Sequence, residues 1–220
     1  MAPRLILMRR TLGVAAFVYA LSHFSLYIVD QHFDLRQVAS EVVLRFYLTI
    51  GFVGLVSFTA LAATSFDRAV RYLGSARWNQ LHVLVYPIAL LAEIHFLLQS
   101  KNDVWQPMLM AGFLVWLFGY RLLFRFAGEV TELRLVGLAV LSACLTAVIE
   151  TAWYALRTGV DASMVFLANF DFSYDIRPAW WVLAAGLTVA IASFIWRQRP
   201  SARRTPSRAF AGSTGVHSAS

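Results

Sequence analysis

The sequence predicts an all-α fold, a polytopic transmembrane helical bundle with about six spans. Two observations support this class. Of the 220 residues, 59% are hydrophobic and 14% are charged, and the mean hydropathy is +0.63, a balance typical of membrane-embedded chains. The apolar residues also gather in long runs, and a helix needs about 20 of them to cross roughly 30 Å of hydrocarbon.

Six runs are long enough to span a membrane. They lie near 11–29, 44–65, 79–99, 107–124, 135–156 and 178–196. The first run is too long for the apolar core of a signal peptide, and DQHFDLRQ follows it in place of a small-residue cleavage site. We therefore expect it to remain as the first helix of the bundle.

Arginine and lysine are distributed unequally between alternate connections, and this predicts the orientation of the bundle. One side carries fourteen: Arg4, Arg9, Arg10, Arg68, Arg71, Arg77, Arg121, Arg125, Arg134, Arg197, Arg199, Arg203, Arg204 and Arg208. The other side carries five: Arg36, Arg45, Lys101, Arg157 and Arg177. The positive-inside rule places both termini in the cytoplasm, which agrees with an even number of spans, so we expect a multi-pass membrane protein.

Several function classes are excluded or disfavoured by composition. The single cysteine, Cys144, rules out an intrachain disulfide, Cys-rich zinc sites, thiolate iron–sulfur clusters and c-type haem attachment. No P-loop or GxGxxG fingerprint is present, so the sequence contains no recognisable ATP- or NAD-binding domain. The net charge of +7 comes from arginines that lie mostly on one side of the predicted bundle. Membrane topology therefore explains the charge, and we expect no nucleic-acid partner.

Two connecting segments have distinctive compositions. The tail at 197–220 is basic, small and polar, and we expect a disordered cytoplasmic segment attracted to anionic lipid. The connection at 158–178 is long, contains three aspartates and faces the other side, where it could form a short surface helix or a docking surface.

Two histidines are expected at one depth on different helices. The first and third spans run in the same direction, so His23 and His95 should lie at similar depth in the outer half. Two such imidazoles can supply both axial ligands to a haem iron between the helices, which suits electron transfer because no coordination position stays open. The alternative for each is a hydrogen bond to a neighbouring helix or exposure in a polar cavity.

The remaining polar residues of the spans are harder to place. His82 lies near the cytoplasmic end of the third span, about 20 Å from His95 along an ideal helix axis, and no histidine of the first span matches its depth. Its alternative is a hydrogen-bonded interfacial histidine. His32 is expected at the outer interface. Glu93 and Glu150 could serve a proton or quinone site, although Glu150 could instead snorkel or pair with Arg157.

The runs RRTLGVAAFVYALSHFSLY (9–27) and LAATSFDRAVRYLGSARWNQLHVLVYPIALLAEIHF (61–96) resemble the MsrQ/YedZ family, the haem-binding membrane subunits of the methionine sulfoxide reductase system. That family belongs to the ferric-reductase-like transmembrane group. The shared elements are R-R-x-L-G before a helix that ends in His23, then A-x-T-S, L-G, W-x-x-L-H at His82 and I-H at His95. Together they cover roughly 3–125.

The resemblance implies a site and a function. His23, His82 and His95 would be iron ligands for one b-type haem, or for two if His82 serves a second, and Arg9 and Arg10 would serve an inner site by pairing with a haem propionate or a flavin phosphate. In a bacterial inner membrane, electrons would pass from a cytoplasmic flavin reductase or the quinol pool, through haem with or without FMN, to a periplasmic molybdopterin methionine sulfoxide reductase. The chain would be an electron-transfer subunit of an oxidoreductase system rather than its catalytic subunit.

The resemblance also implies a domain organisation. Residues 1–126 would form the ferric-reductase-like haem-binding core, without the spans that family members carry before R-R-x-L-G, and 127–196 would add two further transmembrane helices. Two alternatives to the electron-transfer function stay open. One keeps the haem but delivers electrons to ferric iron or another acceptor. The other is a cofactor-free transporter or assembly protein in which Glu93, His82 and His95 form a relay.

Overall fold

The computed structural model of the protein describes residues 3–101, 103–173 and 175–198. In these residues, every regular element is a helix. The helices are α1 (Pro3–Asp30), α2 (Leu35–Leu44), α3 (Phe46–Ala63), α4 (Asp67–His82), α5 (Val85–Gln99), α6 (Trp105–Ala127), α7 (Glu132–Thr158), α8 (Ala162–Ala168) and α9 (Pro178–Gln198). The predicted tail beyond 198, with His217, lies outside the described residues.

The predicted transmembrane bundle is confirmed. Helices α1, α3, α6, α7 and α9 are each long and apolar enough to cross a membrane, and α4 with α5 passes the same test as one bent span, which makes up to six. The observed helices coincide with the predicted runs within a few residues, except in the third. There the helix stops at His82 and resumes at Val85 with a bend of 41°.

Pro87 explains this break. It lies in the first turn of α5, where its missing N–H costs nothing, but it cannot donate to the carbonyl four residues earlier, at Val83. A continuous helix through Val83 and Leu84 would therefore lose a hydrogen bond and clash with the proline ring. The prediction of one straight helix over 79–99 was wrong in this respect, and the ideal-helix spacing between His82 and His95 does not apply.

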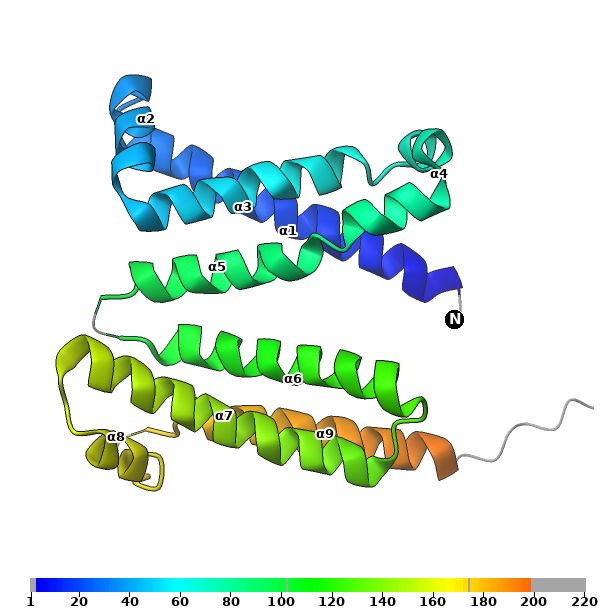
Figure 1. Cartoon of the computed structure of the whole chain (residues 1–220), viewed down its shortest axis with the longest axis vertical. Coiled ribbons are helices and arrows are strands. Elements are labelled where there is room, and N and C mark those ends of the chain that lie inside the picture. The colour runs from blue at the N-terminus through cyan, green and yellow to red at the C-terminus, as the bar shows by residue number, and fades with distance from the viewer. Residues whose placement is uncertain (1–2, 102, 174, 199–220) are drawn as a thin grey trace, which may run out of the picture.

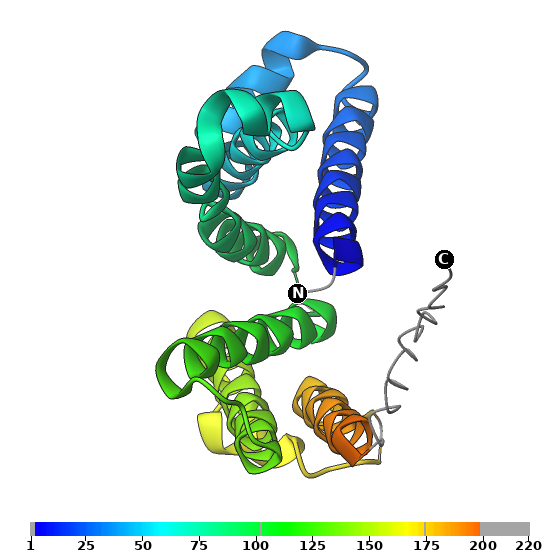
Figure 2. The ribbon, with the colours of Figure 1, turned by 90° about the vertical axis from the view of Figure 1, so that its right-hand side faces the viewer.

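The helices form two groups that lie side by side (Figure 1). One group contains α1 to α5, in which α3 packs against α1, α2 and α5. The other contains α6, α7 and α9, which pack on one another, and α8, which packs on α7. Helices α5 and α6 join the groups, and Figure 2 shows the two groups nearly end-on. We call them the N-terminal group and the C-terminal group.

Short helices mark one end of the bundle. Helix α2 lies across the ends of α1 and α3, and α8 lies at the same end of the C-terminal group (Figure 1). Asp34 starts α2 because its carboxylate accepts the backbone N–H groups of Arg36 and Gln37, each at 3.0 Å. Asp161 caps α8 in the same way. We call this the α2–α8 end of the bundle.

The C-terminal group is held by small side chains that let the helix backbones approach closely. Ala139, Ser142 and Thr146 of α7 are completely buried. A Cβ added to Gly186 of α9 would come within 2.5 Å of the Ala139 Cβ and 3.1 Å of its Cα. Such contacts are typical of helix association in membranes, where packing rather than water exclusion stabilises the interface.

Candidate functional site

A cavity of about 490 Å³ lies within the N-terminal group. Residues of α1, α3 and α5 form its walls, and residues of α2 close it at the α2–α8 end. His23 of α1 and His95 of α5 both line it. The structure therefore brings together the two histidines that the sequence places at one depth, although they are 72 positions apart in the chain.

His95 is held by a hydrogen bond that fixes its tautomer. Its Nδ1 lies 2.8 Å from the backbone carbonyl oxygen of Tyr47, the second residue of α3. Because a carbonyl can only accept, Nδ1 carries the proton, and the lone pair is left on Nε2. A histidine held in this way by its other ring nitrogen is the usual state of an imidazole that binds a metal.

Gly51 makes room for the His95 ring. A Cβ added at Gly51 would lie 2.7 Å from Nδ1 and 2.8 Å from Cε1 of His95, closer than real contacts allow. At Gly54, one turn further along α3, a Cβ would meet only Leu91, at 4.0 Å. The close approach of α3 to the imidazole thus depends on glycine at 51 and not at 54.

The body of the cavity is apolar. Three phenylalanines contribute to it, Phe24 from α1 and Phe52 and Phe58 from α3, and Leu55 and Ile88 add aliphatic surface. Phe24 and Phe52 are in ring contact, with centroids 5.7 Å apart. His23 lines this apolar part of the cavity from α1, one residue before Phe24.

The α2–α8 end of the cavity is polar. The hydroxyl of Tyr27 donates to Glu41 Oε2 at 2.7 Å, and Arg45 donates to Glu41 Oε1 and to the Tyr47 hydroxyl, each at 3.2 Å. The hydrogen bond from Tyr27 is the main reason that the pKa of Glu41 lies below its ordinary value. Arg45 is thus the basic group at this end of the cavity, where the carboxylates of Glu41 and Asp30 also lie.

The sequence prediction missed this polar group. Arg45 is used only in the count of basic residues, and a connection between two spans is predicted where the structure has α2. The available signal was the spacing of Glu41 and Arg45, which is that of an i, i+4 ion pair on one helix face.

These residues fit a haem. Two neutral imidazoles on separate helices are a donor set suited to haem iron. A flat, mostly apolar ring system suits the phenylalanine-lined body, and an arginine at one end suits its propionates. The cavity volume lies in the usual range for small-molecule and cofactor sites.

His82 lies apart from this cavity. Its ring stacks on Trp78 with centroids 3.8 Å apart, and its Nδ1 lies 3.1 Å from the Trp78 carbonyl oxygen. Its Nε2 faces Ser65 Oγ at 3.5 Å, but the Ser65 hydroxyl already donates to the Leu61 carbonyl at 2.7 Å. The lone pair of Nε2 is therefore poorly satisfied, and His82 is not among the residues that line the cavity with His23 and His95.

The predicted inner arginines are only partly described. Arg10 pairs with Asp67 at the start of α4, with 2.6 Å between nitrogen and oxygen. The side chain of Arg9 lies outside the described residues. Arg10, like His82, does not line the cavity that contains His23 and His95.

The other polar residues singled out in the sequence have different surroundings. His32 is exposed in the turn after α1, with a φ of 54°. Glu93 is buried, and its Oε1 has no hydrogen-bond partner in the described part of the chain. Glu150 is buried and pairs with Arg177 at 3.3 Å. The expected snorkelling or pairing with Arg157 was wrong, because the connection after α8 folds back and brings Arg177 over α7.

Comparison with known proteins adds a family match for the N-terminal group. Residues 2–92, which include His23 and His82, match the family described as ferric reductase like transmembrane component. This part of the helical bundle is therefore similar to a ferric-reductase-like transmembrane protein. No solved structure matches the chain.

Several similar proteins share one name. A "Protein-methionine-sulfoxide reductase heme-binding subunit MsrQ" of Agrobacterium fabrum is 41% identical over 119 residues, 54% of this chain and 55% of that protein. Proteins with the same name from Rhodospirillum rubrum and Xanthomonas campestris pv. campestris are 42% identical over 115 residues and 40% identical over 131 residues. These matches cover 52% and 59% of this chain and 55% and 60% of the relatives. The chain is similar to these relatives over a little more than half of its own length, and it spans a little more than half the length of each of them.

Proposed function

We propose that this protein is a haem b-containing electron-transfer subunit of a methionine sulfoxide reductase system. The observation that carries the proposal is the single cavity lined by His23 and His95, in which the Tyr47 carbonyl holds His95 with Nε2 as its lone-pair atom. Support also comes from the relatives, whose name describes a heme-binding subunit. A haem bound there supplies one-electron transfer between the ferric and ferrous states of its iron.

The residues of the cavity have distinct roles in this proposal. His23 and His95 would hold the haem iron, and with both imidazoles bound the iron would transfer electrons rather than bind oxygen. The apolar body formed by Phe24, Phe52 and Leu55 excludes water and keeps the local dielectric low. Arg45 pairs with a propionate at the α2–α8 end and compensates part of its charge.

The proposed direction of electron flow follows from the arginine distribution. Both termini would be cytoplasmic in a bacterial inner membrane, which puts the α2–α8 end, and the cavity near it, on the periplasmic side. The acceptor would be a periplasmic molybdopterin methionine sulfoxide reductase subunit. The donor would be a cytoplasmic flavin reductase or the quinol pool, with FMN as a possible intermediate carrier.

A second site is part of the same proposal. His82, whose Nε2 has only the long 3.5 Å contact with Ser65 Oγ, would be the ligand there, and Arg10 and Arg9 would contact an anionic substituent of the cofactor. The 1–126 core, the two added helices over 127–196 and the basic tail over 197–220 remain the proposed division of the chain.

Absorption spectra test the main proposal. The full-length protein, purified from cells supplied with haem, should show sharp α and β bands after dithionite reduction, as bis-histidine haem does. His23→Ala and His95→Ala should each remove the same set of bands. His82→Ala is the matched control, since His82 lies outside the cavity, and it should leave those bands in place.

Two results would contradict the proposal. Absence of haem bands in the wild-type protein would favour a cofactor-free transporter or assembly protein. If His23→Ala and His82→Ala abolished one common signal that His95→Ala left intact, the pairing of His23 with His95 would be wrong. Two further assays distinguish the acceptors. Co-purification with a periplasmic molybdoenzyme supports a reductase subunit as the acceptor, and reduction of a ferric chelate by the reduced protein supports ferric iron.

A further inference from the structure

The two histidines of the cavity are held by different contacts. His95 of α5 is fixed on α3, because its Nδ1 donates to the Tyr47 carbonyl at 2.8 Å. His23 is carried by α1, which packs against α3 but has no buried residue in its span, Arg10–Asp30. A pair of iron ligands needs a constant separation, so the two histidines can act together only if α1 keeps its position relative to α3.

A continuous chain of hydrogen bonds joins α1 to α3 at the α2–α8 end. Tyr27 lies one turn after His23 on the same face of α1, and its hydroxyl donates to Glu41 Oε2 of α2 at 2.7 Å. Arg45, between α2 and α3, donates to Glu41 Oε1 and to the Tyr47 hydroxyl, each at 3.2 Å. We call these four residues, Tyr27, Glu41, Arg45 and Tyr47, the polar bridge. It ends on the residue whose carbonyl holds the other histidine.

Glu41 is the centre of the polar bridge. Its side chain is 19% exposed, and its two oxygens accept hydrogen bonds from two directions, one from α1 and one from the corner between α2 and α3. The hydrogen bond from Tyr27 lowers the pKa of Glu41, so the carboxylate is ionised at neutral pH. Hydrogen bonds to an ionised acceptor are stronger than those between neutral groups, and this applies to both of its partners.

Helix α2 is itself fastened to α3, so Glu41 has a fixed position. The Thr49 hydroxyl of α3 donates to the Val42 carbonyl of α2 at 2.6 Å, and Val38, one turn before Val42, is buried. Because Glu41 directly precedes Val42, it is held with α3. Its hydrogen bond to Tyr27 therefore holds α1 against α3 as well.

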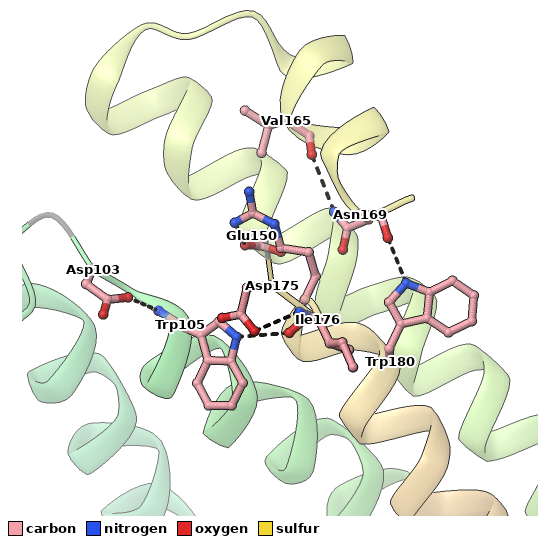
Figure 3. A network of polar contacts seen from close by, with 9 residues as sticks. Asp103, Trp105, Glu150, Val165, Asn169, Asp175, Ile176 and Trp180 are labelled. Carbon is pink, nitrogen blue, oxygen red and sulfur yellow. Dashed lines mark hydrogen bonds and ion pairs between the residues drawn. The ribbon is translucent and has the colours of Figure 1, made fainter. Parts of the chain in front are cut away.

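The same end of the C-terminal group has separate contacts of its own (Figure 3). The Trp105 indole of α6 donates to the Ile176 carbonyl at 3.1 Å, and the Trp180 indole of α9 donates to the Asn169 carbonyl at 2.7 Å. These bonds join the connection after α8 to α6 and α9 without any residue of the polar bridge. Loss of the polar bridge should therefore affect α1 and leave the C-terminal group in place.

We propose that Glu41 is a positioning residue that holds α1 against α3 through Tyr27. It thereby keeps His23 opposite His95 in the cavity. The inference rests on the proposed function, because it concerns a haem held by both histidines. It also predicts an asymmetry between the two ligands. When the polar bridge is broken, His95 stays in place, since its bond to the Tyr47 carbonyl does not pass through Tyr27, and His23 is the ligand that moves away.

Carbon monoxide binding to the reduced, haem-loaded protein tests the proposal, because carbon monoxide binds the iron only where an axial ligand has left. Tyr27→Phe removes one hydroxyl and keeps the ring and the charge. It should retain haem through His95, lose part of the low-spin absorption spectrum, and bind carbon monoxide roughly tenfold faster, as expected from the loss of a hydrogen bond to a charged acceptor. Glu41→Gln, which keeps the side-chain size, should change both readouts in the same direction.

A matched control and a rescue distinguish positioning from a general loss of stability. Tyr19→Phe is the same substitution on the same helix, but Tyr19 is 79% exposed and does not line the cavity, so carbon monoxide binding should equal that of the wild type. Free imidazole should restore the low-spin spectrum of Tyr27→Phe, because it can replace the displaced His23. A misfolded protein would show no such recovery.

Three results with the haem-loaded protein would overturn the proposal. The first is carbon monoxide association in Tyr27→Phe and Glu41→Gln that equals the wild-type rate. The second is equal acceleration in Tyr19→Phe, since any change in α1 would then have the same effect. The third is a low-spin spectrum that imidazole does not restore.

A wild-type protein without haem would instead contradict the proposed function, and the polar bridge is then tested alone in the haem-free protein. Protection of the α2 amides against hydrogen exchange should fall roughly tenfold in Tyr27→Phe and stay unchanged in Tyr19→Phe. Equal protection in the two variants would overturn the positioning role of Glu41 whether or not haem is bound.

Discussion

The two helix groups differ in how completely they bury their own residues. In α7 of the C-terminal group, 39% of the span is buried, whereas none of the α1 span in the N-terminal group is buried. The C-terminal group is filled by its own small side chains, such as Ala139, Ser142 and Thr146 of α7. The N-terminal group instead encloses a cavity with two histidines.

This difference in burial predicts that the C-terminal group contributes mainly to stability and the N-terminal group mainly to cofactor binding. A membrane bundle that packs Gly on Ala gains its stability from close contact between its helices. A bundle that keeps an apolar cavity between its helices gives up those contacts, and a bound cofactor would restore them. Substitutions in the C-terminal group should therefore change stability, and substitutions in the N-terminal group should change cofactor content.

The largest effect is expected at Gly51. Gly51→Ala places a Cβ against the His95 ring, which displaces the imidazole from the Tyr47 carbonyl and from the cavity. We expect most of the bound haem to be lost, measured as haem per protein by pyridine haemochrome. Gly54→Ala, where the added Cβ meets only Leu91 at 4.0 Å, is the control and should retain haem. Equal retention in both variants would argue against His95 as a ligand.

The next effect concerns the buried ion pair of the C-terminal group. Arg177→Met removes the partner of Glu150 and leaves a carboxylate buried without compensation. We expect a loss of about 2 kcal/mol in the free energy of unfolding, less than for a fully buried pair because the Arg177 side chain is 36% exposed. Unfolding by detergent denaturation measures it, and haem content should not change. Arg157→Met is the control, since Glu150 pairs with Arg177 instead.

Gly186 offers a related test of packing. Gly186→Ala forces α9 away from Ala139 of α7, and overpacking of this kind costs about 1–3 kcal/mol. Gly137→Ala, also on α7 but with nothing within 4 Å of the added Cβ, should be neutral or slightly stabilising because alanine favours helix. If thermal unfolding shows the two variants to be equally stable, close contact does not hold the C-terminal group together.

The smallest effect is a pH dependence at the polar end of the cavity. The pKa of Glu41 is lowered, chiefly by the hydrogen bond from Tyr27, so its contribution to stability is complete above the ordinary carboxyl value of about 4.3. It is lost as the pH falls below that value and through the lowered pKa. The protection of the α2 amides against hydrogen exchange, measured relative to the intrinsic exchange rate at each pH, should therefore fall in acid, and Tyr27→Phe should move the transition to higher pH. An unchanged transition in that variant would refute the assigned cause.

Much of the fold followed from local sequence. Span length and composition predicted five of the six runs within a few residues, because crossing a membrane demands an apolar helix of fixed length. The similar depth of His23 and His95 followed from the same rule, since rise per residue converts sequence position into depth. The N–H groups at the start of α2 and α8 needed caps, and Asp34 and Asp161 provide them, although the sequence reading did not use that signal.

The sequence by itself therefore determined that this is a bundle of membrane helices, and which histidines share a depth. Only the tertiary structure decided what those residues face. Tyr47 holds His95 from 48 positions away, Gly51 admits its ring, and Arg177 rather than Arg157 reaches Glu150. Depth depends on position along one helix, whereas facing depends on helix rotation, bends such as the one before Pro87, and the path of loops, which arise only when the helices pack together.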